Sequence, residues 1–237
     1  DSWHVPLAVL EASCPDVFDV VEAARTYALV RDPLERFPSS LRERMKKFGA
    51  APLGMATRRE ARYALDEALE LLTEPLDLDR ALPKEWIHFQ PQASYVYLRG
   101  RRIVRVLATP AHLESWLEDL LRHLGAPPNT LPAGTRRRRV NTARSYRWLG
   151  VSRWVERRFK PWAFQHLPMS LVRGVGPTMK RVLYTEQPST VIDDLLRADR
   201  VREAVERAFA ADVELHARVA SRGLDIVSAA GSSSRSG

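Results

Sequence analysis

The chain has 237 residues, 45% of them hydrophobic, which suffices for one α/β domain with a sizeable core or at most two small domains. Its formal charge of +8 favours an anionic partner such as a nucleotide, a nucleic acid, an acidic polysaccharide or a membrane surface. The single cysteine, Cys14, excludes an internal disulfide, and no apolar run reaches the ~18 residues of a transmembrane segment.

The first clear pattern along the chain is a strand, a turn and a helix. Residues 26–30 are a short β-prone apolar run, typical of a buried parallel strand. After Arg31, Asp32 stands at the expected N-cap of a helix and Pro33 at its first position, with Glu35 two residues later. The sequence therefore predicts a strand that ends at Arg31 and a helix that begins at Pro33.

Strand and helix patterns alternate along most of the remaining chain. We expect helices that begin at Thr57, with Glu60 as its capping partner, and at residues 110 and 199. Short strands or extended segments are expected at residues 86–89, 95–98 and 103–108. This alternation predicts an α/β fold with a mostly parallel sheet flanked by helices.

Arg31 lies at the position where α/β folds bind ligands, beyond the carboxyl end of a strand. A guanidinium beside a helix N-terminus offers a fork of donors to a phosphate, and the hydroxyl of Ser39 can add another. The alternative is that Arg31 pairs with a surface carboxylate and that Asp32 only caps the helix.

The run from Val30 to Phe37 reads Val-Arg-Asp-Pro-Leu-Glu-Arg-Phe and is followed by Ser39. It resembles the 3′-phosphate-binding motif of the carbohydrate sulfotransferases of the family 2 type. In that family the first Arg and the Ser hold the 3′-phosphate of the sulfate donor PAPS (3′-phosphoadenosine 5′-phosphosulfate). The resemblance implies these roles for Arg31 and Ser39, and a P-loop-NTPase-like sulfotransferase fold.

Other segments are similar to the same family, each on few residues. They are the His-x-x-Pro-Gln segment at residues 88–92, the helix ending in Leu-Gly at residues 113–125, Asn141, and the aromatic-x-x-Asp pattern of Phe209 and Asp212. The implied organisation is one sulfotransferase-like domain over residues 1–225, with an insert at 145–190, and a flexible tail at 226–237.

His4 is a candidate general base. In the relatives that sulfate hexuronic acid hydroxyls, a His-Val segment precedes the Arg-Asp-Pro strand and its His takes the proton of the acceptor hydroxyl. His4 and Val5 resemble that segment, and a neutral imidazole suits the role. The alternative is a surface or capping histidine.

The sequence also departs from the family. Pro38 stands where the family has an apolar helix former and is expected to kink the helix, so that Ser40 could replace Ser39. The family binds the 5′-phosphosulfate with a Lys-containing loop that belongs before His4, and nothing in this chain replaces it. The fold is therefore expected to be incomplete at its N-terminus, or to have lost that loop.

The resemblance implies a PAPS-dependent sulfotransferase that moves a sulfuryl group to a hydroxyl of a carbohydrate-type acceptor, without a metal and without a nucleic-acid partner. The alternative is a non-catalytic nucleotide- or polyanion-binding protein of the same fold; charge alone supports a nucleic-acid-binding protein. The arginine run at 136–139 either grips an anion or is a solvated loop. The single cysteine favours a cytoplasmic bacterial enzyme, with the Golgi lumen as the alternative for a truncated eukaryotic chain.

Overall fold

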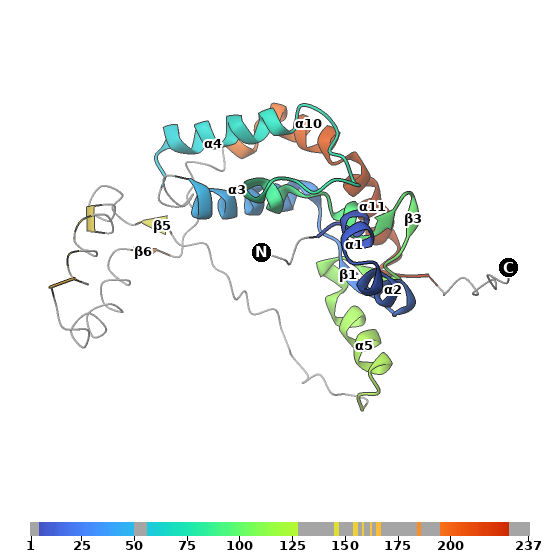
Figure 1. The fold of residues 1–237 in the computed structure, drawn as a ribbon. Helices are drawn as coiled ribbons and strands as arrows, with labels where there is room; N and C mark the ends of the chain where they lie inside the picture. Colours follow the sequence, from blue (N-terminus) through green and yellow to red (C-terminus); the bar gives the residue numbers. More distant parts are fainter. Residues whose placement is uncertain are drawn as a thin grey trace. The chain divides into compact units, whose positions relative to one another are not determined.

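The computed structural model describes residues 5–49, 56–127 and 195–227, together with a few short pieces between residues 145 and 185 (Figure 1). The chain divides into two compact units. The first comprises residues 1–40, 69–136 and 199–237, and the second comprises residues 41–68 and 137–198.

A three-stranded sheet forms the first unit's centre. Its strands are β1 (Tyr27–Leu29), β4 (Val106–Ala108) and β7 (Leu224–Ile226), in the order β1-β4-β7. β1 runs parallel to β4, with Ala28 opposite Leu107, whereas β7 is antiparallel to β4. The α/β prediction therefore holds at the level of mixed helix and strand, but the described sheet is mixed rather than mostly parallel. The reason is that β7 follows helix α11 (Ala210–Arg222) directly, after a turn at Gly223 with φ 73°.

The helices predicted from capping signals are present. They are α3 (Pro33–Phe48), which continues through Pro38, α4 (Arg58–Leu71), the short η4 (Pro110–His112) and α5 (Leu113–His123). The capping box of α4 is complete, because Thr57 N–H donates to Glu60 Oε2 at 2.8 Å and Glu60 N–H donates to Thr57 Oγ1 at 3.2 Å. The predicted final helix is instead two helices, α10 (Asp199–Ala208) and α11 (Ala210–Arg222).

The strand prediction for residues 86–89 is wrong, and that for 95–98 is correct only at its end. Residues 86–89 belong to the 3-10 helix η2 (Lys84–Phe89), and a second one, η3 (Gln92–Tyr95), precedes strand β2 (Tyr97–Leu98). Each 3-10 helix directly follows a proline, Pro83 or Pro91, whose carbonyl accepts the first turn's hydrogen bond. The prolines thus start tight turns where aromatic residues had suggested strands.

A helical hairpin and a strand hairpin complete the first unit. α1 (Leu7–Ser13) and α2 (Pro15–Ala23) pack together, and β2 pairs antiparallel with β3 (Arg101–Arg102). Leu7 and Phe18 of the helical hairpin share one buried cluster with Leu98 and Ile103. These contacts fasten the N-terminal helices to the strand hairpin.

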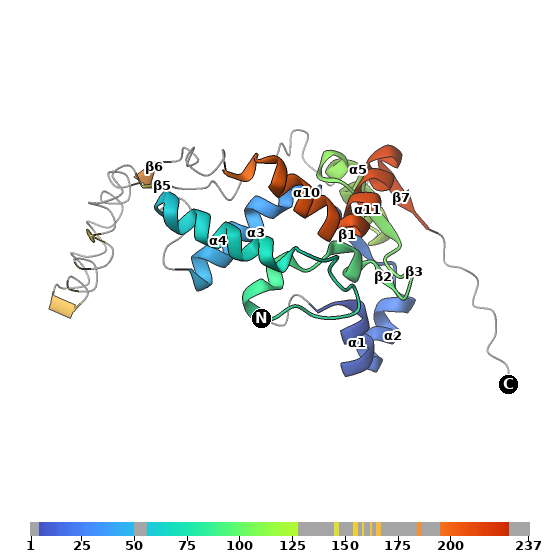
Figure 2. The same cartoon turned by 90° about the horizontal axis from the view of Figure 1, so that it is seen from above.

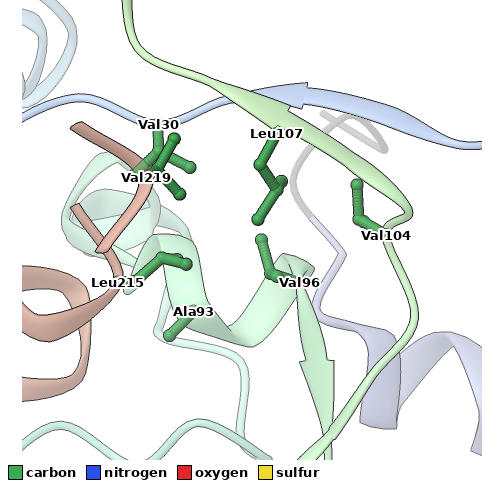
Figure 3. Close-up of a cluster of buried hydrophobic side chains, with 7 residues drawn as sticks. All are labelled: Val30, Ala93, Val96, Val104, Leu107, Leu215 and Val219. Carbon is green, nitrogen blue, oxygen red and sulfur yellow. The ribbon is translucent and has the colours of Figure 1, made fainter. Parts of the chain in front are cut away.

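The main apolar core lies between the sheet, α11 and η3. Figure 3 shows Val30 and Leu107, from neighbouring strands, with Leu215 and Val219 of α11 and with Ala93 and Val96. Seen from above, α11 lies beside β7 and the strands of the sheet (Figure 2). The core therefore joins the end of β1 to η3 and to α11, which are far apart in sequence.

The second unit contains the C-terminal part of α3 and the N-terminal part of α4. Leu41 and Met45 of α3 and Ala61, Ala64 and Leu65 of α4 are buried. Arg44 Nη1 lies 3.0 Å from Glu67 Oε2 and links the two helices. A short antiparallel pair, β5 (Ser145–Tyr146) and β6 (Tyr184–Thr185), joins positions near the two ends of the predicted insert.

Several sequence-based predictions concern residues that the structure does not describe, wholly or for the most part. His4, the arginine run at 136–139, Asn141, most of the insert and residues 228–237 of the tail lie outside the described part. The first two residues of the predicted tail are described: Ile226 ends β7, and Val227 N–H donates to the Arg105 carbonyl at 2.9 Å. Within the described part, no helix is long and apolar enough to cross a membrane.

Candidate functional site

The candidate site is built on the turn between β1 and α3. Val30 N–H donates to the Ala108 carbonyl at 2.8 Å and so continues the pairing of β1 with β4. Asp32 Oδ1 then accepts the N–H of Leu34 at 2.8 Å, which caps α3 as the sequence predicts. Arg31 lies between these two fixed points, at the carboxyl end of a parallel strand and beside a helix N-terminus.

The side chain of Arg31 is exposed. Among the residues that the structure describes, no carboxylate forms an ion pair with it, so the alternative of a surface ion pair finds no partner there. Its guanidinium therefore presents a positive charge to solvent at the edge of the sheet.

The backbone of Arg31 is held on both sides by one side chain, that of Gln92 in η3. Arg31 N–H donates to Gln92 Oε1 at 3.0 Å, and Gln92 Nε2 donates to the Arg31 carbonyl at 2.7 Å. The amide thus binds both peptide groups of one residue, as a neighbouring strand would do. These two bonds fix the direction in which the chain leaves β1.

Gln92 is itself held by a buried carboxylate, Asp212 of α11. Asp212 Oδ2 accepts the N–H of Gln92 at 2.8 Å, and Oδ1 accepts the N–H of Ala93 at 2.7 Å. The side chain of Asp212 has no exposed surface. It therefore satisfies the free N–H groups at the start of η3 from a helix about 120 residues later in the chain.

Asp212 also forms an ion pair with Arg36, one turn into α3. Arg36 Nη2 lies 2.8 Å from Asp212 Oδ2, and Arg36 Nη1 donates to the Gln90 carbonyl at 2.7 Å. The guanidinium carbon of Arg36 lies 5.0 Å from the centre of the Phe209 ring, within the range of a cation–π contact. Arg36 is thus fully engaged in the interior.

The electrostatics of this group follow from its burial. Burial raises the pKa of the Asp212 carboxyl, while the charge of Arg36 and the amides of Ala93 and Gln92 oppose that rise. Burial lowers the pKa of Arg36, the charge of Asp212 opposes this, and the positive charge of Arg31 adds to the lowering. The Arg36–Asp212 pair neutralises its own charges, so it does not compensate that of Arg31.

Tyr95 closes this group. Burial raises the pKa of its phenol to about 12, so the hydroxyl stays neutral at physiological pH. Its hydroxyl oxygen is buried and has no hydrogen-bond partner within the described part of the chain. The charge of Arg36 lowers the pKa of this phenol and that of Asp212 raises it, so Tyr95 lies within the electrostatic reach of the pair.

The serines of the predicted motif differ in their availability. Ser39 is half-buried on α3, eight residues after Arg31. Ser40 is buried and its Oγ donates to the His88 carbonyl at 2.6 Å. Ser40 is therefore a poor replacement for Ser39, because its proton is already used within the fold.

Two further histidines, His88 and His112, lie in the described part. His88 lies in η2, and its carbonyl receives Ser40. His112 Nδ1 lies 3.0 Å from Thr109 Oγ1, at the exit of β4. No group of three metal-ligating side chains occurs within the described residues.

Sequence reasoning missed the connection between Arg36, Gln92 and Asp212. Each lies in a segment that resembles the sulfotransferase family, yet no single segment indicates that the three meet. One signal was available: Asp212 stands on the apolar stripe of the terminal helix, three residues after Phe209. A carboxylate in such a place is rarely buried without a partner, so it predicts a buried cation.

No protein-family model, no curated protein and no solved structure matches this chain.

Proposed function

We propose that this chain is a PAPS-dependent sulfotransferase with a P-loop-like fold, in which Arg31 and Ser39 hold the donor's 3′-phosphate. The observation that carries the proposal is the uncompensated guanidinium of Arg31 on a turn fixed by Asp32 and Gln92. A fixed turn matters because little conformational entropy is lost when the phosphate binds.

The helix that follows the turn adds to this attraction. The N–H groups of the first turn of α3 carry the positive end of the helix dipole, which favours an anion beside Arg31. Pro33 has no N–H, Asp32 Oδ1 accepts the N–H of Leu34, and the Asp32 carbonyl accepts that of Arg36 at 2.9 Å, which leaves the N–H of Glu35 for a ligand.

A second line of support comes from the way in which the family-like segments meet. The motif helix contributes Arg36, the His-x-x-Pro-Gln segment contributes Gln92, and the aromatic-x-x-Asp pattern contributes Asp212. Three segments that are individually weak signals thus share one hydrogen-bonded group next to Arg31. This meeting of the three segments supports the proposal.

The proposed reaction moves a sulfuryl group from PAPS to a hydroxyl of a carbohydrate-type acceptor. The acceptor oxygen forms a bond to sulfur while the bond from sulfur to the bridging phosphate oxygen breaks, and adenosine 3′,5′-bisphosphate leaves. The hydroxyl proton passes to a general base, for which the family resemblance suggests His4. Positive groups stabilise the charge that spreads over the transferring group.

Calorimetry with adenosine 3′,5′-bisphosphate tests the donor site. We expect measurable binding by the unaltered chain and a loss of about 1.5–3 kcal/mol in Arg31→Ala, the range for a hydrogen bond to a charged group. Ser39→Ala should lose less, about 1 kcal/mol, because its hydroxyl is neutral. Arg202→Ala, at an exposed arginine of α10, is the matched control and should bind normally.

Equal affinities of the unaltered chain and Arg31→Ala would argue strongly against the assignment. A second assay separates binding from chemistry: the chain is incubated with PAPS and a panel of sugar acceptors, and sulfated product is measured. Binding that depends on Arg31 but is accompanied by no transfer would support the non-catalytic alternative.

A further inference from the structure

Gln92 does more than join two segments of the core. Its side chain contacts Arg31 only through the backbone, on both the N–H and the carbonyl side, and leaves the guanidinium untouched. Because one flat amide binds both groups, it constrains the backbone of Arg31 and with it the direction of the Cα–Cβ bond. The direction in which the Arg31 side chain leaves the backbone is thereby set before any ligand binds.

The support behind Gln92 is rigid. Its backbone N–H is bound by Asp212, and the neighbouring Gln90 is buried, with Oε1 accepting the Leu82 N–H at 2.8 Å and Nε2 donating to the Arg80 carbonyl at 3.1 Å. Because the backbone around Gln92 is held by these hydrogen bonds, its side chain is a fixed partner for the backbone of Arg31. Residues 90–93 therefore act as a template for the turn.

We propose that Gln92 is a positioning residue, which sets the direction of the Arg31 guanidinium toward the donor's 3′-phosphate. The inference rests on the proposed donor site and adds to it a residue that never touches the ligand. An arginine on a free turn reaches many anions weakly, whereas an aimed one favours a phosphate at one fixed place.

The test begins with the turn itself, without any ligand. Gln92→Met keeps the length of this half-buried side chain and removes both hydrogen bonds. We expect the Arg31 amide to exchange its hydrogen about five times faster or more, while the Val30 amide, bound to the Ala108 carbonyl, is unaffected. An unchanged Arg31 amide would overturn the inference at its first step.

The second readout is a double-mutant cycle on the affinity for adenosine 3′,5′-bisphosphate. Gln92→Met should weaken binding about fivefold, the worth of a typical hydrogen bond, and should cause no further loss when Arg31→Ala is already present. A merely structural role for Gln92 predicts the same loss in both backgrounds. That result, or unchanged affinity in the single variant, would overturn the proposal.

Two controls complete the experiment. The same substitution at the exposed Gln165 should leave both readouts unchanged. If Gln92→Met fails to fold, Gln92→Asn replaces it, since its shorter side chain stays polar but cannot reach both groups of Arg31. If the unaltered chain does not bind the nucleotide, the donor site is rejected, and this inference with it. If the nucleotide binds but Arg31 and Gln92 show no coupling, the inference alone is rejected.

Discussion

The two ends of strand β1 each carry an arginine, and the two arginines have opposite surroundings. At the amino end, Arg25 Nη2 lies 2.9 Å from Asp119 Oδ2, and Arg25 Nε donates to the Tyr27 hydroxyl at 2.8 Å. At the carboxyl end, Arg31 is exposed and has no carboxylate partner among the described residues. The same residue type is thus neutralised at one end and left charged at the other.

The comparison shows why a net charge of +8 does not locate a site. Many of the arginines in the described part are paired, as Arg102 is with Asp225 at 2.7 Å. What distinguishes Arg31 is a well-fixed backbone together with an uncommitted side chain. We therefore regard the balance of local partners, rather than the number of arginines, as the mark of an anion site.

The largest effect that we expect concerns the buried pair behind the carboxyl end. Asp212→Asn leaves the charge of Arg36 buried without its counter-ion, because the side chain of Arg36 is only 14% exposed. The free energy of unfolding should fall by about 3–5 kcal/mol, measured by urea denaturation. The double variant Arg36→Met/Asp212→Asn is the control and should recover part of the loss, because it removes the buried charge while the Asn oxygen can still accept a backbone N–H. A loss below ~1 kcal/mol would show that this pair is not the anchor described above.

A smaller effect is expected at the amino end. The pair of Arg25 and Asp119 is partly open to solvent, with 33% and 12% of the side chains exposed, so water can replace much of the interaction. Asp119→Asn should therefore lower the free energy of unfolding by about 1 kcal/mol or less, in the same denaturation assay. A loss as large as that of Asp212→Asn would remove the distinction between the two ends.

The pH dependence of stability refines this second prediction. Burial raises the pKa of Asp119, but the hydrogen bonds from Arg25 and Tyr27 outweigh it and leave the pKa below its ordinary value of 3.8. The stabilisation from Asp119 is therefore present above that value and is lost as pH falls through the lower, folded pKa. We expect the difference in unfolding free energy between the unaltered chain and Asp119→Asn to shrink over this acidic range. A difference that grows on acidification would contradict the stated direction.

The smallest effect should follow from Arg31→Ala in the absence of ligand. The side chain is exposed, and the hydrogen bonds that fix the turn come from its backbone, which alanine retains. We expect the melting curve to report a change within ~0.5 kcal/mol. A larger loss would mean that the arginine is a structural element, as Arg25 is, and the contrast between the two ends would disappear.

The parts of the fold that sequence predicted are those with local causes. Asp32 and Pro33 begin α3 directly after β1, through a hydrogen bond between residues two positions apart. Thr57 and Glu60 cap α4 through contacts three residues apart. The 3-10 helices η2 and η3 were missed because Trp86 and Tyr95 favour strands. The prolines before them, and the binding of Asp212 to the start of η3, decide otherwise.

The candidate site divides in the same way. Arg31 and Ser39 could be named from one motif, because their spacing is local. The roles of Gln92 and Asp212 depend on long-range contacts. Gln92 lies 61 positions after Arg31, and Asp212 lies 120 positions after Gln92, so no local pattern specifies that they meet. The residue type of Asp212 indicates only that a buried carboxylate needs a partner, and does not show which residue that partner is.

The carboxylate of Asp212 also imposes an order on biosynthesis. A ribosome releases the β1–α3 turn early, yet Asp212, which holds the backbone of Gln92, comes 176 residues after Arg36 of α3. Until α11 is synthesised, Arg36 lacks its counter-ion Asp212, and Gln92, which holds the backbone of Arg31, lacks its own bond to Asp212. The β1–α3 turn is therefore fixed in its final geometry only after α11 has been synthesised.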